Sequence, residues 1–134
     1  MLKQKEYLWS IFKVSFESLH YFFEYNASGY LHERRSMIYF IVTIYTDDNK
    51  DKTEYETYIK EVKPIVEHFG GRYLVRTNHI IPLSDKWKPE RIIIIQWQSK
   101  AQMEQCFASA EYRKLAGKRE NSVDSRAIIV EDEG

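Results

Sequence analysis

The sequence has one cysteine, Cys106, among 134 residues, which excludes an intrachain disulfide and a metal site built from several cysteines. Its 20 basic and 20 acidic residues cancel, so no overall field attracts nucleic acid or an anionic membrane. The aromatic-rich residues 5–25 are interrupted by Lys13, Glu17 and Glu24, and so lack the ~20 apolar residues of a membrane-spanning helix. We therefore expect a cytoplasmic protein with no nucleic-acid or membrane partner.

The motifs that mark common cofactors and nucleophiles are also missing. The sequence has no G-x-G-x-x-G fingerprint, no phosphate-binding loop and no nucleophile elbow. No two of its four histidines lie four residues apart beside an acid, so we expect no metal and no cofactor. His79 would need a hydrogen-bond partner to act as a general base, and no spacing supplies one. The sequence alone leaves open whether the protein is an enzyme.

Residues 1–36 differ in character from the rest of the chain. Apolar residues spaced three or four apart within residues 5–25 predict a helix, and residues 26–36 predict a polar linker. The segment preceding Met37 can be back-translated as a ribosome-binding sequence, so residues 1–36 are interpreted as either a mis-annotated leader or a helical extension that docks on the domain or on a partner. Residues 37–134 are the predicted domain.

Hydrophobic periodicity predicts the elements of this domain. Residues 37–46 alternate as a strand, residues 51–69 carry a helical stripe containing Pro64, and Gly70 suits a left-handed helix end. We expect further strands from Arg72 to about Leu83, over 91–97 and over 124–131, with Ser99 capping the first of two helical stretches before the last strand. This β-α-β-β-α-β order predicts an α+β, ferredoxin-like fold with a four-stranded antiparallel sheet and helices on one face.

Four consecutive isoleucines, Ile92 to Ile95, lie in the third predicted strand. A strand that is apolar at every position must be buried on both faces. The helices of this chain can cover one face only, and an apolar patch left on the other face normally marks an interface. We therefore predict a homodimer in which two sheets pack face to face as a dimeric α+β barrel.

Candidate ligand-binding residues lie on and around these strands. Arg72 and Arg76 are four residues apart, so a regular strand would place them on one face, where they could clamp an anionic small molecule. The alternative is that they form structural ion pairs, and Arg91 and Asp124 carry the same ambiguity. Aromatic residues could line an apolar pocket between sheet and helices, or could be ordinary core residues. These aromatic candidates are Tyr39, Tyr73, Trp87 and Trp97.

Several motifs together resemble one bacterial family. They are Gly70-Gly71-Arg72-Tyr73-Leu74-Val75-Arg76, Trp87-x-Pro89-x-Arg91, Ser109-x-Glu111-Tyr112 and Asp124-Ser125-Arg126. The chain from Met37 to about Asp132 is identified as a member of the Domain of Unknown Function 1330 family, of the dimeric α+β barrel superfamily. Thr77-Asn78 departs from the glycine pair that the family usually has there.

The resemblance implies a fold and an assembly rather than a reaction. Relatives in the superfamily include cofactor-free monooxygenases, haem enzymes and small-molecule isomerases, among which a fold cannot choose. Our first hypothesis is an uncharacterised homodimeric protein that binds a small molecule. The second is a cofactor-independent monooxygenase- or isomerase-like enzyme acting on a small aromatic or carbonyl compound.

Overall fold

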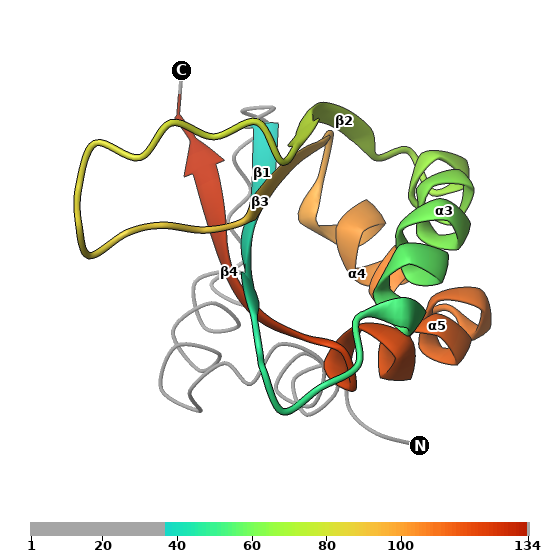
Figure 1. Cartoon of the computed structure of the whole chain (residues 1–134). Helices are drawn as coiled ribbons and strands as arrows, with labels where there is room; N and C mark the ends of the chain where they lie inside the picture. Colours follow the sequence, from blue (N-terminus) through green and yellow to red (C-terminus); the bar gives the residue numbers. More distant parts are fainter. Residues whose placement is uncertain (1–36, 134) are drawn as a thin grey trace, which may run out of the picture.

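The computed structural model describes residues 37–133, and the helix predicted over residues 5–25 lies outside this range. A four-stranded sheet forms one layer and three helices form the other (Figure 1). No helix in the described part of the chain is long and apolar enough to cross a membrane. The elements in chain order are β1 (Met37–Thr46), α3 (Thr53–His68), β2 (Arg72–Thr77), β3 (Arg91–Trp97), α4 (Lys100–Ala108), α5 (Ala110–Glu120) and β4 (Val123–Asp132).

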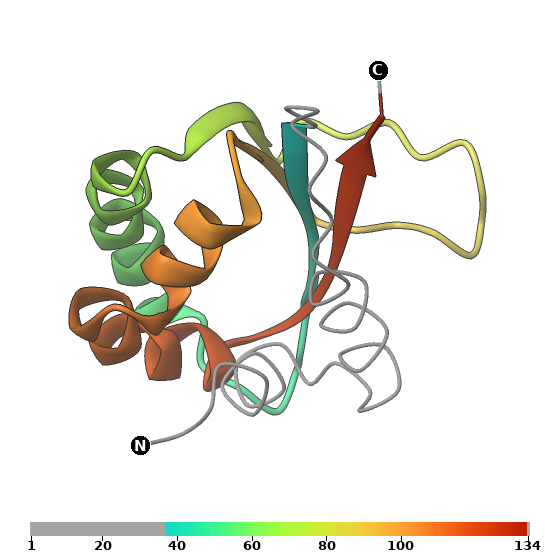
Figure 2. The same ribbon diagram turned by 180° about the vertical axis from the view of Figure 1, so that it is seen from behind.

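The strands are antiparallel in the order β2-β3-β1-β4, which is the ferredoxin-like arrangement predicted from the sequence. Strand β1 pairs with β3 on one side and with β4 on the other. Val42 of β1, for example, lies opposite Ile93 of β3 and opposite Ala127 of β4. The helices lie on one side of the sheet in both opposite views (Figures 1 and 2). The α+β fold is thus confirmed.

Local side-chain chemistry sets the helix ends. Asp51 accepts a hydrogen bond from the backbone N–H of Thr53 at 2.9 Å, where α3 begins. Gly70 has a φ of 94°, which favours glycine and ends that helix as expected. The side chain of Ser99 caps α4, also as expected, and that of Ser109 caps α5.

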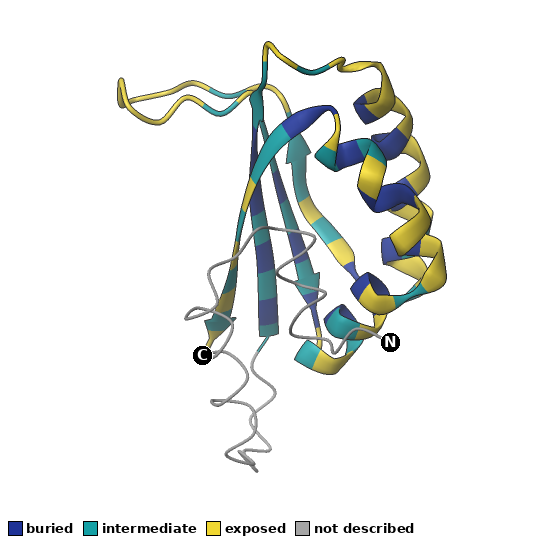
Figure 3. Ribbon diagram, turned by 90° about the horizontal axis from the view of Figure 1, so that it is seen from below, coloured by how far each residue is buried: buried dark blue, intermediate teal, exposed yellow. Residues whose placement is uncertain are grey.

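The core lies between the sheet and the helices, where buried residues of both layers meet (Figure 3). Trp97 is 0% exposed and packs edge-on against Phe107, at 6.1 Å between ring centroids. Cys106 is a buried free thiol. Helices α3 and α5, called the two outer helices here, are joined by an ion pair at 3.2 Å between Glu61 of α3 and Lys118 of α5. The strand residues on this face are Ile38, Phe40, Val42, Ile44, Ile93, Ile95, Trp97 and Val123.

Strand β2 differs from the sequence prediction in length and in register. It ends at Thr77 rather than near Leu83. At this end the hydroxyl of Thr77 accepts a hydrogen bond from the backbone N–H of His79. The apolar residues that suggested a longer strand belong to an exposed loop. A β-bulge between Tyr73 and Val75 inserts Leu74 into the pairing with β3. The bulge reverses which side chains face the helices from that point on.

The face of the sheet away from the helices is called the open face here. One row crosses all four strands with an apolar side chain at every position: Val75, Ile94, Ile41 and Ile128. Ile92 and Ile94 lie on this face, whereas Ile93 and Ile95 are buried under the helices. The isoleucine run therefore supplies apolar side chains to both faces, as predicted.

Candidate functional site

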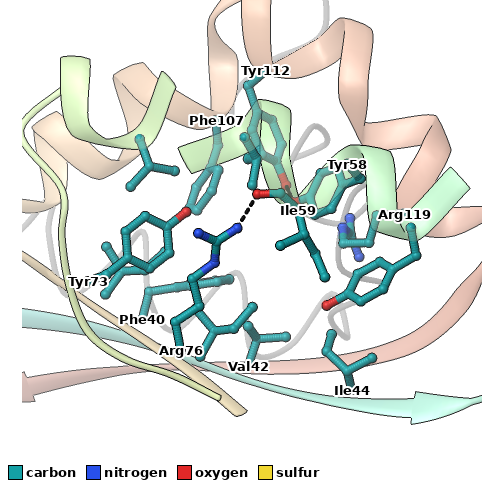
Figure 4. Close-up of a pocket in the computed structure, with 15 residues that line it drawn as sticks. Phe40, Val42, Ile44, Tyr58, Ile59, Tyr73, Arg76, Phe107, Tyr112 and Arg119 are labelled. Atoms are coloured by element: carbon teal, nitrogen blue, oxygen red, sulfur yellow. Dashed lines mark hydrogen bonds between the residues drawn. The ribbon is translucent and has the colours of Figure 1, made fainter. Parts of the chain in front are cut away.

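A small cavity of about 30 Å³ lies between the sheet and the helices (Figure 4). This volume is enough for one or two water molecules. Its floor is the buried face of β1 and β3, and its roof is formed by α3, α4 and α5. The lining consists of Phe40, Val42, Ile44, Tyr55, Tyr58, Ile59, Val62, Val66, Tyr73, Arg76, Ile93, Ile95, Phe107, Tyr112 and Arg119.

Arg76 enters the cavity from the edge strand β2. Because of the bulge, Arg76 pairs with Ile93, whose side chain faces the helices. Its guanidinium donates a hydrogen bond to the backbone carbonyl of Ile59 in α3 and lies 5.3 Å from the centre of the Tyr73 ring (Figure 4). No aspartate or glutamate within residues 37–133 forms an ion pair with it. The positive charge of Arg76 is thus held by a neutral carbonyl and an aromatic ring.

A second polar group is built by the two outer helices. The hydroxyls of Tyr58 on α3 and Tyr112 on α5 lie 3.2 Å apart and share a hydrogen bond. Arg119, about two turns beyond Tyr112 on α5, is 3% exposed and within hydrogen-bonding reach of Tyr112. It also donates to the hydroxyl of Ser125 on β4. A guanidinium and two phenols therefore meet under the helices, away from solvent.

Tyr55 is a cavity residue with an incomplete set of hydrogen bonds. It is 6% exposed, and its hydroxyl has no hydrogen-bond partner within residues 37–133. Burial raises the pKa of Tyr55 to about 12, while the positive charges of Arg91, Arg119 and Arg76 oppose that rise. The Nε of Arg91 is likewise buried, with no hydrogen-bond partner in the described part of the chain. Three guanidinium charges thus act on one buried hydroxyl that is free to bond to a ligand.

The cavity offers hydrogen-bond donors but no side chain that accepts a proton at neutral pH. Its lining contains two arginines and no aspartate, glutamate, histidine, lysine or cysteine. Burial raises the pKa of Tyr58 and Tyr73 as well, so these phenols stay protonated. Among residues 37–133, no group of three or more His, Cys, Asp or Glu side chains could hold a metal ion.

The structure brings few of the predicted site residues together. Arg76 and Tyr73 line the cavity, whereas Arg91 is not part of the lining and only its positive charge acts on the pKa of Tyr55. The expectation that Arg72 and Arg76 share a face is wrong, because the bulge at Leu74 puts Arg72 on the open face opposite Gln96. No clamp of these two arginines exists.

The other predicted residues lie elsewhere. Tyr39 is on the open face, where its hydroxyl accepts a hydrogen bond from Gln96 at 3.3 Å. Asp124 is on the same face and pairs at 3.0 Å with Arg126, which stacks on the ring of Tyr45. Trp87 is in the exposed loop, and Trp97 is a core residue that does not line the cavity.

The sequence reasoning missed four polar residues of the cavity. Tyr55 and Tyr58 lie on the helical stripe of residues 51–69, and Tyr112 lies in the last predicted helical stretch, where the pattern by itself indicates core residues. Arg119 continues the inward face of that stretch at helical spacing from Tyr112 and Leu115. That spacing was a usable signal, since an arginine on a buried helical stripe needs polar neighbours.

Comparison with known proteins agrees with this architecture. RPA0582, a protein of unknown function from Rhodopseudomonas palustris, superposes with a TM-score of 0.62 at 19% identity, covering 80% of this chain and 90% of that one. Its methylated form gives 0.63 at 18% identity, covering 81% and 89%. SnoaB, a cofactor-independent oxygenase from Streptomyces nogalater, gives 0.44 at 9% identity, covering 71% and 89%. At these identities the likeness to RPA0582 shows the fold alone.

No functionally curated protein matches the sequence. The model of one family, described as Domain of unknown function (DUF1330), matches residues 37–132, which span all seven described elements. The resemblance noted in the sequence is thereby confirmed, and the chain belongs to the Domain of Unknown Function 1330 family.

Proposed function

We propose that this protein is a homodimer that binds a small organic anion, such as a carboxylate or an enolate, in the cavity between sheet and helices. The observation that carries the proposal is the charge of the lining, which has two guanidinium groups and no acidic side chain. Arg119 already forms an ion pair with Glu120 at 3.8 Å. Arg76 is half-buried and forms no ion pair with an acidic residue of 37–133, so an anionic ligand would compensate the charge of Arg76.

Arg76 is the residue proposed to hold the anion. An arginine fork can donate two parallel hydrogen bonds to a carboxylate, and such charge-assisted bonds are stronger than a bond to a neutral carbonyl. In the present structure Arg76 donates to the carbonyl of Ile59 instead. An arriving anion would replace that carbonyl, and the protonated hydroxyl of Tyr55 would donate a further bond to it.

Ligand entry requires the cavity to widen. Ligand pockets for drug-sized molecules span roughly 300–1,000 Å³, whereas this cavity measures about 30 Å³. Arg76 and Tyr73 belong to β2, which among the four described strands lies at the edge and pairs only with β3. Movement of this edge would open the cavity without breaking the centre of the sheet. The proposed ligand is therefore small, with a carboxylate or enolate on a compact carbon skeleton.

Homodimer formation is proposed through the open face. The apolar row Val75, Ile94, Ile41 and Ile128 crosses the whole sheet, and Ile128 is 59% exposed in the single chain. Pairing two such faces would bury both rows. The proposal keeps the bacterial, cytoplasmic setting expected from the sequence.

A second candidate is a cofactor-independent enzyme of the isomerase or monooxygenase type acting on a small aromatic or carbonyl compound. The unpartnered hydroxyl of Tyr55 favours it, because a protonated phenol beside guanidinium groups could stabilise an enolate formed from such a substrate. Turnover of a carbonyl substrate that is lost in Tyr55→Phe would support the enzyme. Binding without turnover would support the binding protein.

The binding proposal is tested by thermal-shift and calorimetric titration with acetate, pyruvate, benzoate and salicylate. Arg76→Ala should abolish the response to any of these anions that raises the melting temperature of the unaltered protein. Arg72→Ala is the matched control, because it removes the same side chain from the same strand on the opposite face. Equal responses in the Arg76→Ala and unaltered proteins would contradict the proposal.

A further inference from the structure

The loop between β2 and β3, residues 78–90, is called the arm here. It projects from the sheet on the side away from the helices, as Figures 1 and 3 show in two perpendicular views. All of residues 81–88 are exposed. Three of them are large and apolar: Ile81 is 88% exposed, Leu83 98% and Trp87 59%. An arm that carries such residues into solvent lacks the surface that should cover them.

The base of the arm is fastened to the sheet and to the start of α3. The backbone N–H of Glu90 donates to the carbonyl of Ile44 at 2.8 Å. The carboxylate of Glu90 accepts from the hydroxyl of Thr46 and lies 3.5 Å from the ammonium of Lys52. Two prolines, Pro82 and Pro89, restrict the backbone further. The direction of the arm is therefore set by the fold.

We infer that the arm reaches across the interface and packs its apolar side chains on the open face of a second copy of this chain. This inference rests on the homodimer of the proposed function and adds which segment holds the two subunits together. In a two-fold symmetric dimer each subunit both donates an arm and receives one. Formation of one dimer then covers the open faces and the arms of both subunits.

The area of the open face supports this reading. Strands about 4.8 Å apart with about seven paired residues make a face of roughly 450 Å² for four strands. A stable interface buries about 800 Å² on each partner. The sheet face alone falls short of this value, and the arm supplies apolar area of the right kind beside it. Acidic and basic residues are mixed on the arm, so it offers no one-sign field for nucleic acid or membrane.

The first test measures assembly of the full chain by sedimentation equilibrium. The unaltered protein should have twice the chain mass of 16.1 kDa. Leu83→Asp should raise the dimer dissociation constant about tenfold or more, because it places a charge where an apolar contact is expected. Gln105→Asp adds the same charge on the exposed side of α4 and should leave the constant unchanged. A Leu83→Asp protein that dimerises as tightly as the unaltered one would overturn the inference.

The second test locates the arm by cross-linking and does not depend on weakening the dimer. A Leu83→Cys variant can be labelled selectively with a maleimide photo-cross-linker, because the natural thiol of Cys106 is 0% exposed. Mixed ¹⁴N and ¹⁵N subunits separate links between chains from links within one. Links between chains to residues 124–130 of β4 are expected. Links within one chain, to residues 1–36 or to the helices would refute the arm assignment.

The outcomes separate this inference from the proposed function. A monomer in the unaltered protein would remove the homodimer and the arm contact together. If the dissociation constant of the dimer is unchanged by Leu83→Asp and no link forms between chains, the arm contact alone is refuted. Anion binding through Arg76 is measured independently of both, since Leu83 is not part of the cavity lining.

Discussion

Gly71 lies where α3 turns into β2, and replacing it with alanine should destabilise the fold by about 2 kcal/mol. A methyl group built there would come within 2.5 Å of Cγ1 of Val66 and 2.9 Å of Cη2 of Trp97. Neither neighbour can move away easily, because Val66 and Trp97 are fully buried. The backbone is also held, since the N–H of Gly71 donates to the carbonyl of Val66 at 2.9 Å. Insertion of one carbon into a filled core costs about 1–3 kcal/mol.

Gly117→Ala is the matched control for this change. Gly117 lies in α5, and an added methyl group would meet nothing within 4 Å. Alanine is about 0.8–1 kcal/mol better than glycine inside a helix, so this variant should be more stable than the unaltered protein. The same one-carbon addition is therefore expected to shift stability in opposite directions at the two positions.

Urea unfolding followed by circular dichroism measures both variants, at one protein concentration because dimerisation adds to stability. A loss of about 2 kcal/mol corresponds to a fall of roughly 8–16 °C in melting temperature for a domain of this size. A Gly71→Ala protein within about 0.5 kcal/mol of the unaltered one would refute the reasoning. It would mean that the turn is not packed against Trp97 as described.

Two further predictions concern buried ionisable groups. Tyr58→Phe and Tyr112→Phe should each lower the free energy of unfolding in urea by about 1–3 kcal/mol, because the two hydroxyls share a buried hydrogen bond. Tyr112→Phe should cost more, because the Arg119 guanidinium also lies within reach of that hydroxyl. Equal stability of both variants and the unaltered protein would contradict this polar network. Burial, with a smaller contribution from Glu111, raises the pKa of the Cys106 thiol from 9.0 to about 12. A raised pKa favours the neutral thiol in the folded state, so this contribution to stability is complete below pH 9.0 and is lost as pH rises toward 12. Thiol titration at pH 8 should therefore label Cys106 only after denaturant is added, and rapid labelling of the folded protein would contradict its burial.

The sequence predicts the fold well where local chemistry and the tertiary structure agree. Alternation over residues 37–46, the left-handed position of Gly70 and the cap at Ser99 each have a local cause, and each is confirmed. The isoleucine run predicted two apolar faces because side chains of a strand alternate, and this rule needs no knowledge of neighbouring strands.

The candidate site was harder to predict, because it depends on one inserted residue. The parity argument for Arg72 and Arg76 assumes an unbroken strand, and the bulge at Leu74 breaks it. A bulge leaves little trace in hydrophobicity, since Tyr73, Leu74 and Val75 are all apolar or aromatic. The loop was missed for a related reason, because its apolar residues look like strand residues when their exposure is unknown. Both errors arise from pairing between strands, which a single sequence does not display.

The lining of the cavity also limits the chemistry that it can perform. Proton abstraction from a substrate needs a side chain with a pKa near the working pH, and the lining consists only of apolar residues, tyrosines and arginines. The buried phenols of Tyr55, Tyr58 and Tyr73 have raised pKa values and act as donors at neutral pH. These lining residues are suited to stabilise an anion that is already formed and not to create one by removing a proton. Anion binding is therefore the function that we propose for this cavity, and any reaction there would have to begin from a ligand acidic enough to arrive as its own conjugate base.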